Sequence, residues 1–477
     1  MRLRGQVFSA IRWTVAASVS RVLLKVGQVM VFARLLSPED FGLMAIVTAV
    51  LGTASVMSDF GLNSAYMQRR SVSNEARSSL YWANLFMSLS LALLLALSSS
   101  FIASFFGDER LQPLLLLSSL TFPFVALGQQ LRMTAEKALE FRSVVIIEVI
   151  SLAIGFAASL AAVLAGFGVY SLVYGNLLTV ASMSILAWIV LANNWRPLWR
   201  FRYSDIRSLL GFGSAVVANG LVGHINMIID ILIGGKMLIA SQLGLYSAPR
   251  SLILQLHFIV NPIIARVGFP LIAEVQADIP RVRSIYLQMV SMSAAISAPL
   301  CIGISMFSSE VTEIVLGPGW EDSGILLCLL AIWGFVRTTQ SHTQSLLLGM
   351  GRAGLALKWN LGLLFFLIPA TWAGASVGPL GLVVALLSVQ LTLVIPNWYF
   401  LIRPVCNAGM VEYLYCILRP TIIAFFALLM GYLSVGGMEL PVLRLGVAVV
   451  TSGAFYLLLS IKFNKDWFDA MKSLLGQ

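Results

Sequence analysis

Three polar side chains stand about one helical turn apart near the start of the chain, inside a stretch that is otherwise apolar. Arg21, Lys25 and Gln28 are spaced i, i+4 and i+7, which places them on one face of a helix. Two cations one turn apart repel each other, so a carboxylate, an anion or water must stabilise them. Because an arginine fork suits bidentate contact with phosphate, we expect an anion site here. The structural alternative has Arg21 reaching the membrane surface and Lys25 paired with Glu148 or Asp230.

A second polar run interrupts a later apolar segment. Arg337 is followed there by Gln340, His342 and Gln344. Ionisable groups inside membrane helices cost about 2.5–3.5 kcal/mol on insertion scales, so each one is a candidate functional residue. We expect Arg337 to line a cavity and to contribute to the same anion site as the first cluster.

Oxygen-bearing side chains inside apolar segments are candidates for ion coupling. Asn226 and Asp230 lie one helical turn apart, and Asn360 opens a later apolar run. Such groups could hold Na⁺, Asp230 alone could carry H⁺, and Glu148 is the rival proton carrier. A salt bridge between Asp230 and a cavity cation is the alternative. No cofactor other than one of these two ions, and no metal centre, is expected.

The composition indicates the class of protein that carries these charges. Of 477 residues, 59% are hydrophobic and 11% are charged, whereas soluble domains are about 45–50% apolar and about 25% charged. This excludes soluble enzymes, disulfide scaffolds and disordered chains. A spanning helix needs about 20 apolar residues, so the chain can form about 14 spans. We expect an all-α polytopic membrane protein.

Apolar runs separated by charged or Gly/Pro-containing loops locate these helices. Strict alternation, which is typical of membrane barrels, is absent. The expected spans are 14–33, 41–58, 81–105, 111–129, 144–164, 168–191, 209–233, 247–273, 285–308, 323–348, 357–375, 377–401, 413–435 and 440–461. The run Ser37-Pro38-Glu39-Asp40 indicates a well-capped helix start.

Loop charges predict the orientation. With a cytoplasmic N-terminus and an even number of spans, most of the 31 lysines and arginines fall on cytoplasmic loops, as the positive-inside rule requires. Both termini are therefore expected in the cytoplasm. The net charge of +10 reflects orientation, so no nucleic-acid partner is expected.

An internal repeat predicts the domain organisation. Residues 34–43 align with residues 236–245, and a parallel repeat of six helices follows. We expect two parallel six-helix lobes around a central cavity, plus two C-terminal helices. The predicted divisions are an N-terminal lobe at 1–195, a cytoplasmic linker at 196–208, a C-terminal lobe at 209–402, and two additional helices with a cytoplasmic tail at 403–477.

Several short motifs carry a family resemblance. They are Ala33-Arg-Leu-Leu-Ser-Pro-Glu-Asp-Phe-Gly-Leu43, Asp59-Phe-Gly-Leu62 with Gln68, Gly211-Phe-Gly213, Asp230, Leu243-Gly-Leu-Tyr-Ser247, Phe269-Pro270 and Leu316-Gly-Pro-Gly-Trp320. With these motifs the chain resembles the polysaccharide (Wzx-type) flippases of the multidrug/oligosaccharidyl-lipid/polysaccharide exporter superfamily. It looks most similar to exporters of colanic-acid-like exopolysaccharide repeat units.

The resemblance implies a function. Members of this family translocate undecaprenyl-pyrophosphate-linked oligosaccharides across the bacterial inner membrane by alternating access, for exopolysaccharide or lipopolysaccharide biosynthesis. The expected partners are the lipid-linked oligosaccharide and membrane lipid, with a polysaccharide polymerase and assembly proteins as further candidates. No enzymatic activity is expected.

Two other functions remain as alternatives. A cation-coupled drug antiporter of the same superfamily would need an acidic or aromatic cavity, which the basic pair on the first helix argues against. A membrane-embedded polysaccharide polymerase or ligase usually carries a large periplasmic loop, and no outer loop of that size is expected here.

Overall fold

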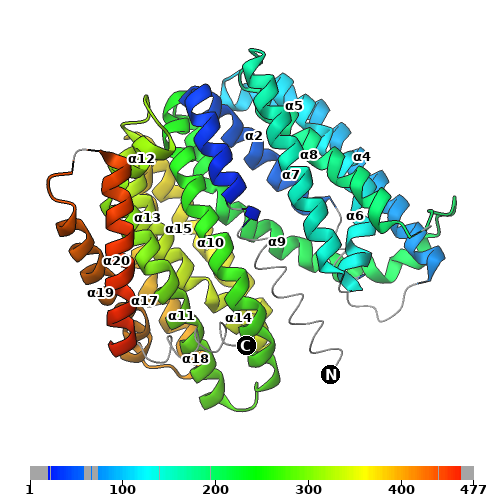
Figure 1. Ribbon diagram of the computed structural model, residues 1–477. Helices are drawn as coiled ribbons and strands as arrows, with labels where there is room; N and C mark the ends of the chain where they lie inside the picture. Colours follow the sequence, from blue (N-terminus) through cyan, green and yellow to red (C-terminus); the bar gives the residue numbers. More distant parts are fainter. Residues whose placement is uncertain are drawn as a thin grey trace. The chain divides into compact units, whose positions relative to one another are not determined.

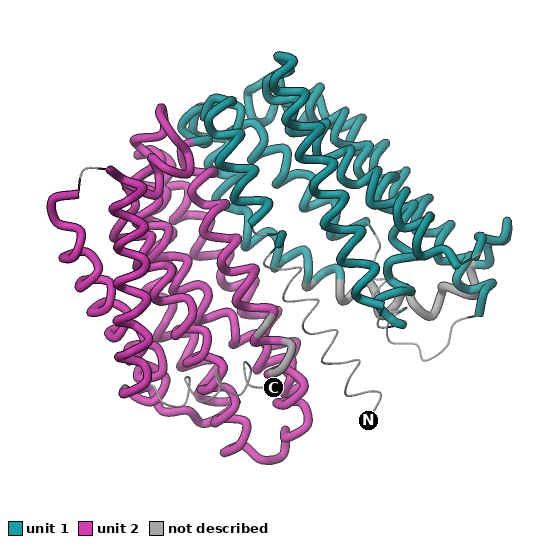
Figure 2. The backbone as a smooth tube through the Cα atoms, viewed as in Figure 1, with its two compact units in different colours: residues 1–244 teal, residues 245–477 magenta. Residues whose placement is uncertain are grey.

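The computed structural model describes residues 20–463 apart from 22, 59–65, 67–72, 139, 194 and 439. The described residues form helices and connecting segments, with no strand among them. Contacts divide the chain into two compact units, unit 1 (Met1–Gly244) and unit 2 (Leu245–Gln477), which Figure 2 shows in teal and magenta. The prediction of an all-α architecture is confirmed.

Unit 1 is a bundle of long helices (Figure 1). Its first described helix covers residues 20–35, apart from 22. The others are α2 (Pro38–Met57), α4 (Asn74–Phe106), α5 (Leu111–Ser119), α6 (Thr121–Lys137), α7 (Phe141–Leu164), α8 (Tyr170–Leu191) and α9 (Tyr203–Met237). Helix α8 packs against α6 and α7, while α9 packs against α2.

The start of α2 follows directly from its sequence. The Ser37 hydroxyl accepts a hydrogen bond from the Asp40 backbone N–H at 3.3 Å, and the Asp40 carboxylate accepts one from the Ser37 N–H at 3.0 Å. This capping box satisfies two N–H groups that the helix itself cannot pair. Pro38 occupies the first helical position, where its missing N–H costs nothing. The predicted helix start is confirmed.

The repeat is visible in the backbone. Helix α2 begins at Pro38, and α10 (Ala240–Glu274) begins 202 residues later at the aligned position. Within unit 1 the two starts cross in contact. A Cβ on Gly42 would overlap the carbonyl oxygen of Ala240, and a Cβ on Gly244 would overlap the carbonyl oxygen of Pro38. The aligned glycines therefore allow a reciprocal backbone contact that no larger residue would permit.

Unit 2 contains most of α10, further long helices and several short ones (Figure 1). These are α11 (Ile279–Met306), α12 (Ser308–Val315), α13 (Ser323–Gln340), α14 (His342–Gly349), α15 (Ala353–Ala375), α16 (Pro379–Thr392), α17 (Val394–Asn397), the π-helix η1 (Trp398–Ile402), α18 (Arg403–Cys406), α19 (Met410–Ser434) and α20 (Pro441–Phe463). The break at Ser341 divides a segment that was predicted as one helix, and so do the breaks after Thr392. The short helix α12 lies in a predicted loop.

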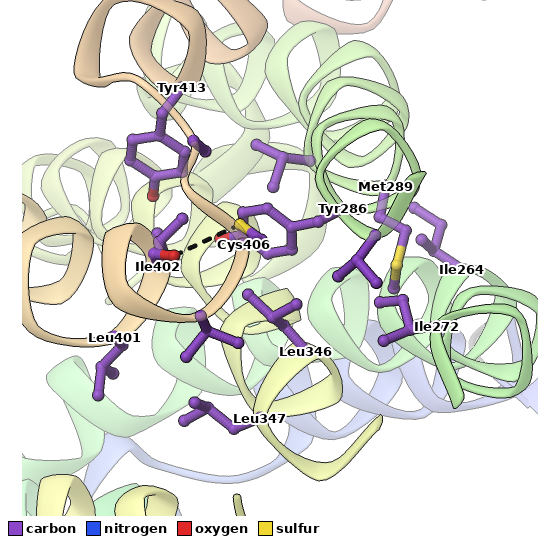
Figure 3. Close-up of a cluster of buried hydrophobic side chains, with 14 of the residues drawn as sticks. Ile264, Ile272, Tyr286, Met289, Leu346, Leu347, Leu401, Ile402, Cys406 and Tyr413 are labelled. Carbon is purple, nitrogen blue, oxygen red and sulfur yellow. Dashed lines mark hydrogen bonds between the residues drawn. The ribbon is translucent and has the colours of Figure 1, made fainter. Parts of the chain in front are cut away.

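A buried cluster holds the interrupted helices in place (Figure 3). Tyr286 of α11, Leu346 of α14 and Tyr413 of α19 are fully buried in it. The Tyr286 hydroxyl also lies 3.2 Å from the hydroxyl of Thr343, and the Cys406 thiol donates to the carbonyl of Ile402 at 3.4 Å. This packing fixes α14 and the α17–α18 region against α11, which positions the polar residues described below.

Twelve helices in the described part of the chain are long and apolar enough to cross a membrane. Helix α10 and the first described helix occupy the other two predicted span positions. The exact count of 14 spans remains a prediction. The predicted division into lobes at 196–208 also remains a prediction. By its contacts, α9 belongs to unit 1.

Candidate ligand-binding cavity

A cavity of about 730 Å³ lies inside unit 2. Six helices contribute polar side chains to its wall. These are His257 and Asn261 from α10, Arg337 and Gln340 from α13, His342 and Gln344 from α14, Asn360 from α15, Gln390 from α16 and Asn397 from α17. A volume of this size suits a small organic ligand or several sugar rings.

Two helix interruptions meet at this cavity. Ser341 separates α13 from α14, and Asn397 ends the short helix α17 directly before the π-helix η1. Irregular backbone at membrane depth is tolerated where it lines a cavity, and π-helical turns occur frequently at functional sites. The interruptions present hydrogen-bonding side chains where an unbroken helix would present an apolar face.

Hydrogen bonds orient the polar side chains between α10 and the break at Ser341. The amide of Asn261 lies 3.0 Å from His257 Nε2, and its carbonyl oxygen accepts a hydrogen bond from the Ser341 hydroxyl at 2.6 Å. The other imidazole nitrogen of His257 lies 3.2 Å from the hydroxyl of Thr338. This chain of contacts ties one wall of the cavity to the other.

A second set of contacts anchors the opposite wall. Gln390 donates through Nε2 to the side-chain oxygen of Gln340 at 2.7 Å, and Thr343 donates to the side-chain oxygen of Asn397 at 3.1 Å. Each carboxamide carries both a donor and an acceptor, so these groups can bind a ligand while keeping one internal partner.

The cavity has a distinct electrostatic character. Among its described lining residues Arg337 carries the one permanent formal charge, and none is Asp, Glu or Lys. The guanidinium carbon of Arg337 lies 5.2 Å from the ring centroid of Trp333. His342 is 1% exposed, and its Nε2 atom has no hydrogen-bond partner among the described residues. The lining favours an anionic or neutral hydrogen-bonding ligand over a cation.

A family model described as polysaccharide biosynthesis protein matches residues 31–324, which is more than half of the chain. The chain belongs to this polysaccharide biosynthesis protein family. It is therefore a multi-span membrane protein of that family, as the sequence motifs indicated.

Two curated relatives and one solved structure are similar over nearly the whole chain. The lipopolysaccharide biosynthesis protein WzxC of Escherichia coli (strain K12) is 26% identical over 91% of this chain and 88% of its own. The teichuronic acid biosynthesis protein TuaB of Bacillus subtilis (strain 168) is 28% identical over 96% of this chain and 95% of its own. The fold is similar to that of the lipid II flippase MurJ in its inward closed conformation, with a TM-score of 0.76, 14% identity and coverage of 96% of this chain and 100% of that one.

The structure places the predicted site residues of this family member in three locations. Arg337 and Asn360 both line the cavity of unit 2. Asn226 and Asp230 are buried together on α9 of unit 1, with exposed fractions of 8% and 2%. Their roles in ligand or ion binding remain predictions.

The first predicted cluster contains an ion pair. Arg21 Nη1 lies 2.9 Å from Glu148 Oε1 on α7. Lys25 interacts electrostatically with both of these charges, and Gln28 is half-buried on the same helix. The carboxylate needed to stabilise the two cations is thus Glu148, and its hydrogen bond goes to Arg21 rather than to Lys25.

Sequence reasoning missed three carboxamides of the cavity, namely Asn261, Gln390 and Asn397. Two of them stand next to prolines within apolar runs, at Asn261-Pro262 and Pro396-Asn397. A polar residue beside a helix-disrupting proline would have been a usable signal. The motif at 59–62 and Gln68 lie outside the described residues. Among the described residues, no group of three or more His, Cys, Asp or Glu side chains is arranged to hold a metal ion.

Proposed function

We propose that this chain is a flippase that moves lipid-linked oligosaccharide repeat units across the bacterial inner membrane for polysaccharide biosynthesis. The observation that carries the proposal is the polar cavity of unit 2. Its described lining residues carry one permanent charge, that of Arg337, and all of its helices except α10 are apolar enough to span a membrane. Membership of the polysaccharide biosynthesis protein family, the names of its relatives and the MurJ-like fold support it. Flipping leaves every covalent bond of the cargo intact, so the proposal requires no enzymatic activity.

The cavity lining matches the polar head of such a substrate. Six carboxamides line it, and each can exchange hydrogen bonds with sugar hydroxyls. The Arg337 fork suits bidentate contact with a phosphate oxygen of undecaprenyl pyrophosphate, while the prenyl chain stays in lipid. Arg21, Lys25 and Gln28 of unit 1 remain the other predicted contacts for the anionic head.

The Arg21–Glu148 pair supports a coupling role for H⁺. An anionic ligand that binds Arg21 competes with the Glu148 carboxylate, which lies 2.9 Å from the guanidinium. Glu148, released from this partner, is then the predicted proton carrier. Ligand binding and proton uptake would thereby be linked. Na⁺ held by Asn226 and Asp230 is the alternative coupling ion.

The cavity also bears on the competing functions. A drug antiporter must accept organic cations, and a cavity with Arg337 and no carboxylate among its described lining residues repels them. The drug antiporter is therefore less well supported than the flippase. The similarity of the fold to that of the lipid II flippase MurJ favours transport over a polymerase or ligase.

The test uses cells whose surface polymer depends on this chain. Arg337→Ala and Arg21→Ala should each reduce polymer export at normal protein abundance, and Arg337→Lys should retain part of it because the charge remains. Arg352→Ala is the matched control, since Arg352 is exposed and lies outside the cavity lining. Full export from both alanine variants at normal protein abundance would overturn the proposal.

A further inference from the structure

The segment between α8 and α9 forms an ordered strap over the start of α4. The strap, Trp195-Arg-Pro-Leu-Trp-Arg-Phe-Arg202, contains neither helix nor strand. Hydrogen bonds nevertheless fix it at three points. The backbone N–H groups of Leu198 and Arg202 donate to the hydroxyls of Ser78 and Ser79 at 3.1 and 3.2 Å, and the Leu198 carbonyl accepts from Trp82 Nε1 at 2.8 Å.

Aromatic rings attach the strap to the helices below it. Trp195 stacks on Trp188 of α8 with ring centroids 6.1 Å apart, and Trp199 packs on Trp82 of α4 at 4.7 Å. The guanidinium carbon of Arg77 lies 3.9 Å from the centroid of the Trp195 ring, so a further positive charge lies beside the strap.

The strap holds apolar side chains outward. Trp199 is 92% exposed, Phe201 is 55% exposed and Leu198 is 47% exposed. Because hydrogen bonds on both sides of Trp199 fix the backbone, these side chains stay at the surface instead of folding back into the bundle. An ordered, exposed apolar surface of this kind indicates a binding site.

Its position in the fold identifies the environment. The strap starts just after α8 ends at Leu191 and lies on the first turns of α4, and both helices are candidate membrane spans. It therefore lies at the boundary between membrane and water, where tryptophan is enriched at the level of lipid headgroups.

The charge on the strap identifies the ligand. Arg196, Arg200 and Arg202 are exposed and alternate with the apolar residues. Glu75 interacts electrostatically with Arg200 and neutralises part of this charge, yet the strap together with Arg77 keeps an excess of positive charge. A surface that combines outward aromatic rings with arginine forks complements a lipid with an anionic headgroup.

We propose that the strap is a binding site for anionic phospholipid of the surrounding bilayer. The arginines contact the headgroup phosphate, and Trp199 and Phe201 insert at the boundary between headgroups and acyl chains. This site is separate from the cavity of unit 2 and does not depend on the flippase proposal.

The test uses the full-length chain in nanodiscs of phosphatidylcholine, with or without about one third phosphatidylglycerol. Phosphatidylglycerol should raise the melting temperature of the wild type and increase the number of lipids retained in native mass spectrometry. Replacing Arg196, Arg200 and Arg202 by Gln should abolish most of both effects, while the melting temperature in pure phosphatidylcholine stays unchanged. Trp199→Ala keeps every charge and every backbone contact of the strap. It should lose part of the rise in melting temperature and part of the retained lipid.

Two matched variants separate this site from general charge. Replacing Arg281, Arg352 and Lys358 by Gln removes three exposed positive charges from unit 2 and should leave the effect of phosphatidylglycerol intact. Replacing the three strap arginines by Lys keeps the charge and should retain most of the effect of phosphatidylglycerol. The proposal is overturned if the strap Gln variant responds to phosphatidylglycerol like the wild type, or if the unit 2 variant loses as much of this response. It is also overturned if inorganic diphosphate alone produces the full shift in melting temperature.

Discussion

Arg21 donates a hydrogen bond from Nη1 to Glu148 Oε1 at 2.9 Å and so joins the first described helix of unit 1 to α7. The two residues are 127 positions apart in the sequence. Their side chains are 38% and 18% exposed, so the pair is only partly desolvated. An ion pair in this environment stabilises the bundle modestly, and an anionic ligand can displace the carboxylate more easily than from a fully buried pair.

Removing the carboxylate should therefore destabilise unit 1. Glu148→Gln leaves Arg21 and Lys25 one turn apart without their shared counter-charge, and we expect a loss of about 1–2 kcal/mol in unfolding free energy. Thermal unfolding in detergent measures it. The double variant Arg21→Gln/Glu148→Gln should recover part of this loss, since it removes the repulsion as well as the attraction. A double variant less stable than both single variants would contradict this explanation.

A charge introduced into the cavity should impair transport without unfolding the protein. Gln390→Glu is isosteric, but it places a carboxylate beside Gln340 in a cavity whose permanent charge comes from Arg337. We expect export of an anionic cargo to fall by about tenfold, which corresponds to about 1.4 kcal/mol of lost binding. Gln288→Glu, at an exposed position of α11, is the matched control. Unchanged export from Gln390→Glu would show that this wall of the cavity does not meet the charged part of the cargo.

Features that depend only on neighbouring residues could be predicted from the sequence. The capping box at Ser37 and Asp40 and the repeat that aligns Pro38 with Ala240 both need only short segments. Hydropathy also located the helices, because burial in lipid requires long apolar runs.

Features that depend on distant contacts could not be predicted in the same way. Helical spacing places Arg21 and Lys25 on one face but says nothing of which helix lies opposite, so the partner of Glu148 was left open. The break at Ser341 was not predicted either. The polar run around it was assigned to one continuous helix, and the hydrogen bond from Ser341 goes to Asn261, 80 positions away in the sequence. The cavity arises where two such breaks meet, and for that reason Asn397 was missed.

Acid should weaken a contact outside the membrane spans. Arg110 donates to the carboxylate of Asp108 at 2.7 Å and to Glu39 at 2.7 Å, and the hydrogen bond from Arg110 holds the pKa of Asp108 below its usual value. A lowered folded-state pKa contributes stability above the unfolded-state pKa, near 3.8, and that stability is lost as the pH falls through the folded-state pKa. Arg110→Gln should therefore lower the melting temperature at pH 7 but progressively less below about pH 4. If the melting temperature of Arg110→Gln stays below that of the wild type by the same amount from pH 7 to pH 3, the contact does not depend on the ionisation of Asp108.

The reciprocal glycine contact should be intolerant of a single methyl group. A Cβ at Gly42 or Gly244 would overlap the backbone oxygen of Ala240 or Pro38, and a carbonyl cannot rotate away as a flexible side chain can. We expect Gly42→Ala and Gly244→Ala each to cost about 1–3 kcal/mol by forcing the helix starts apart. Gly27→Ala is the matched control, because a Cβ there meets nothing within 4 Å and alanine favours the helix. Melting temperatures of the three variants measure the effect, and equal stability of all three would show that the two helix starts do not cross in contact.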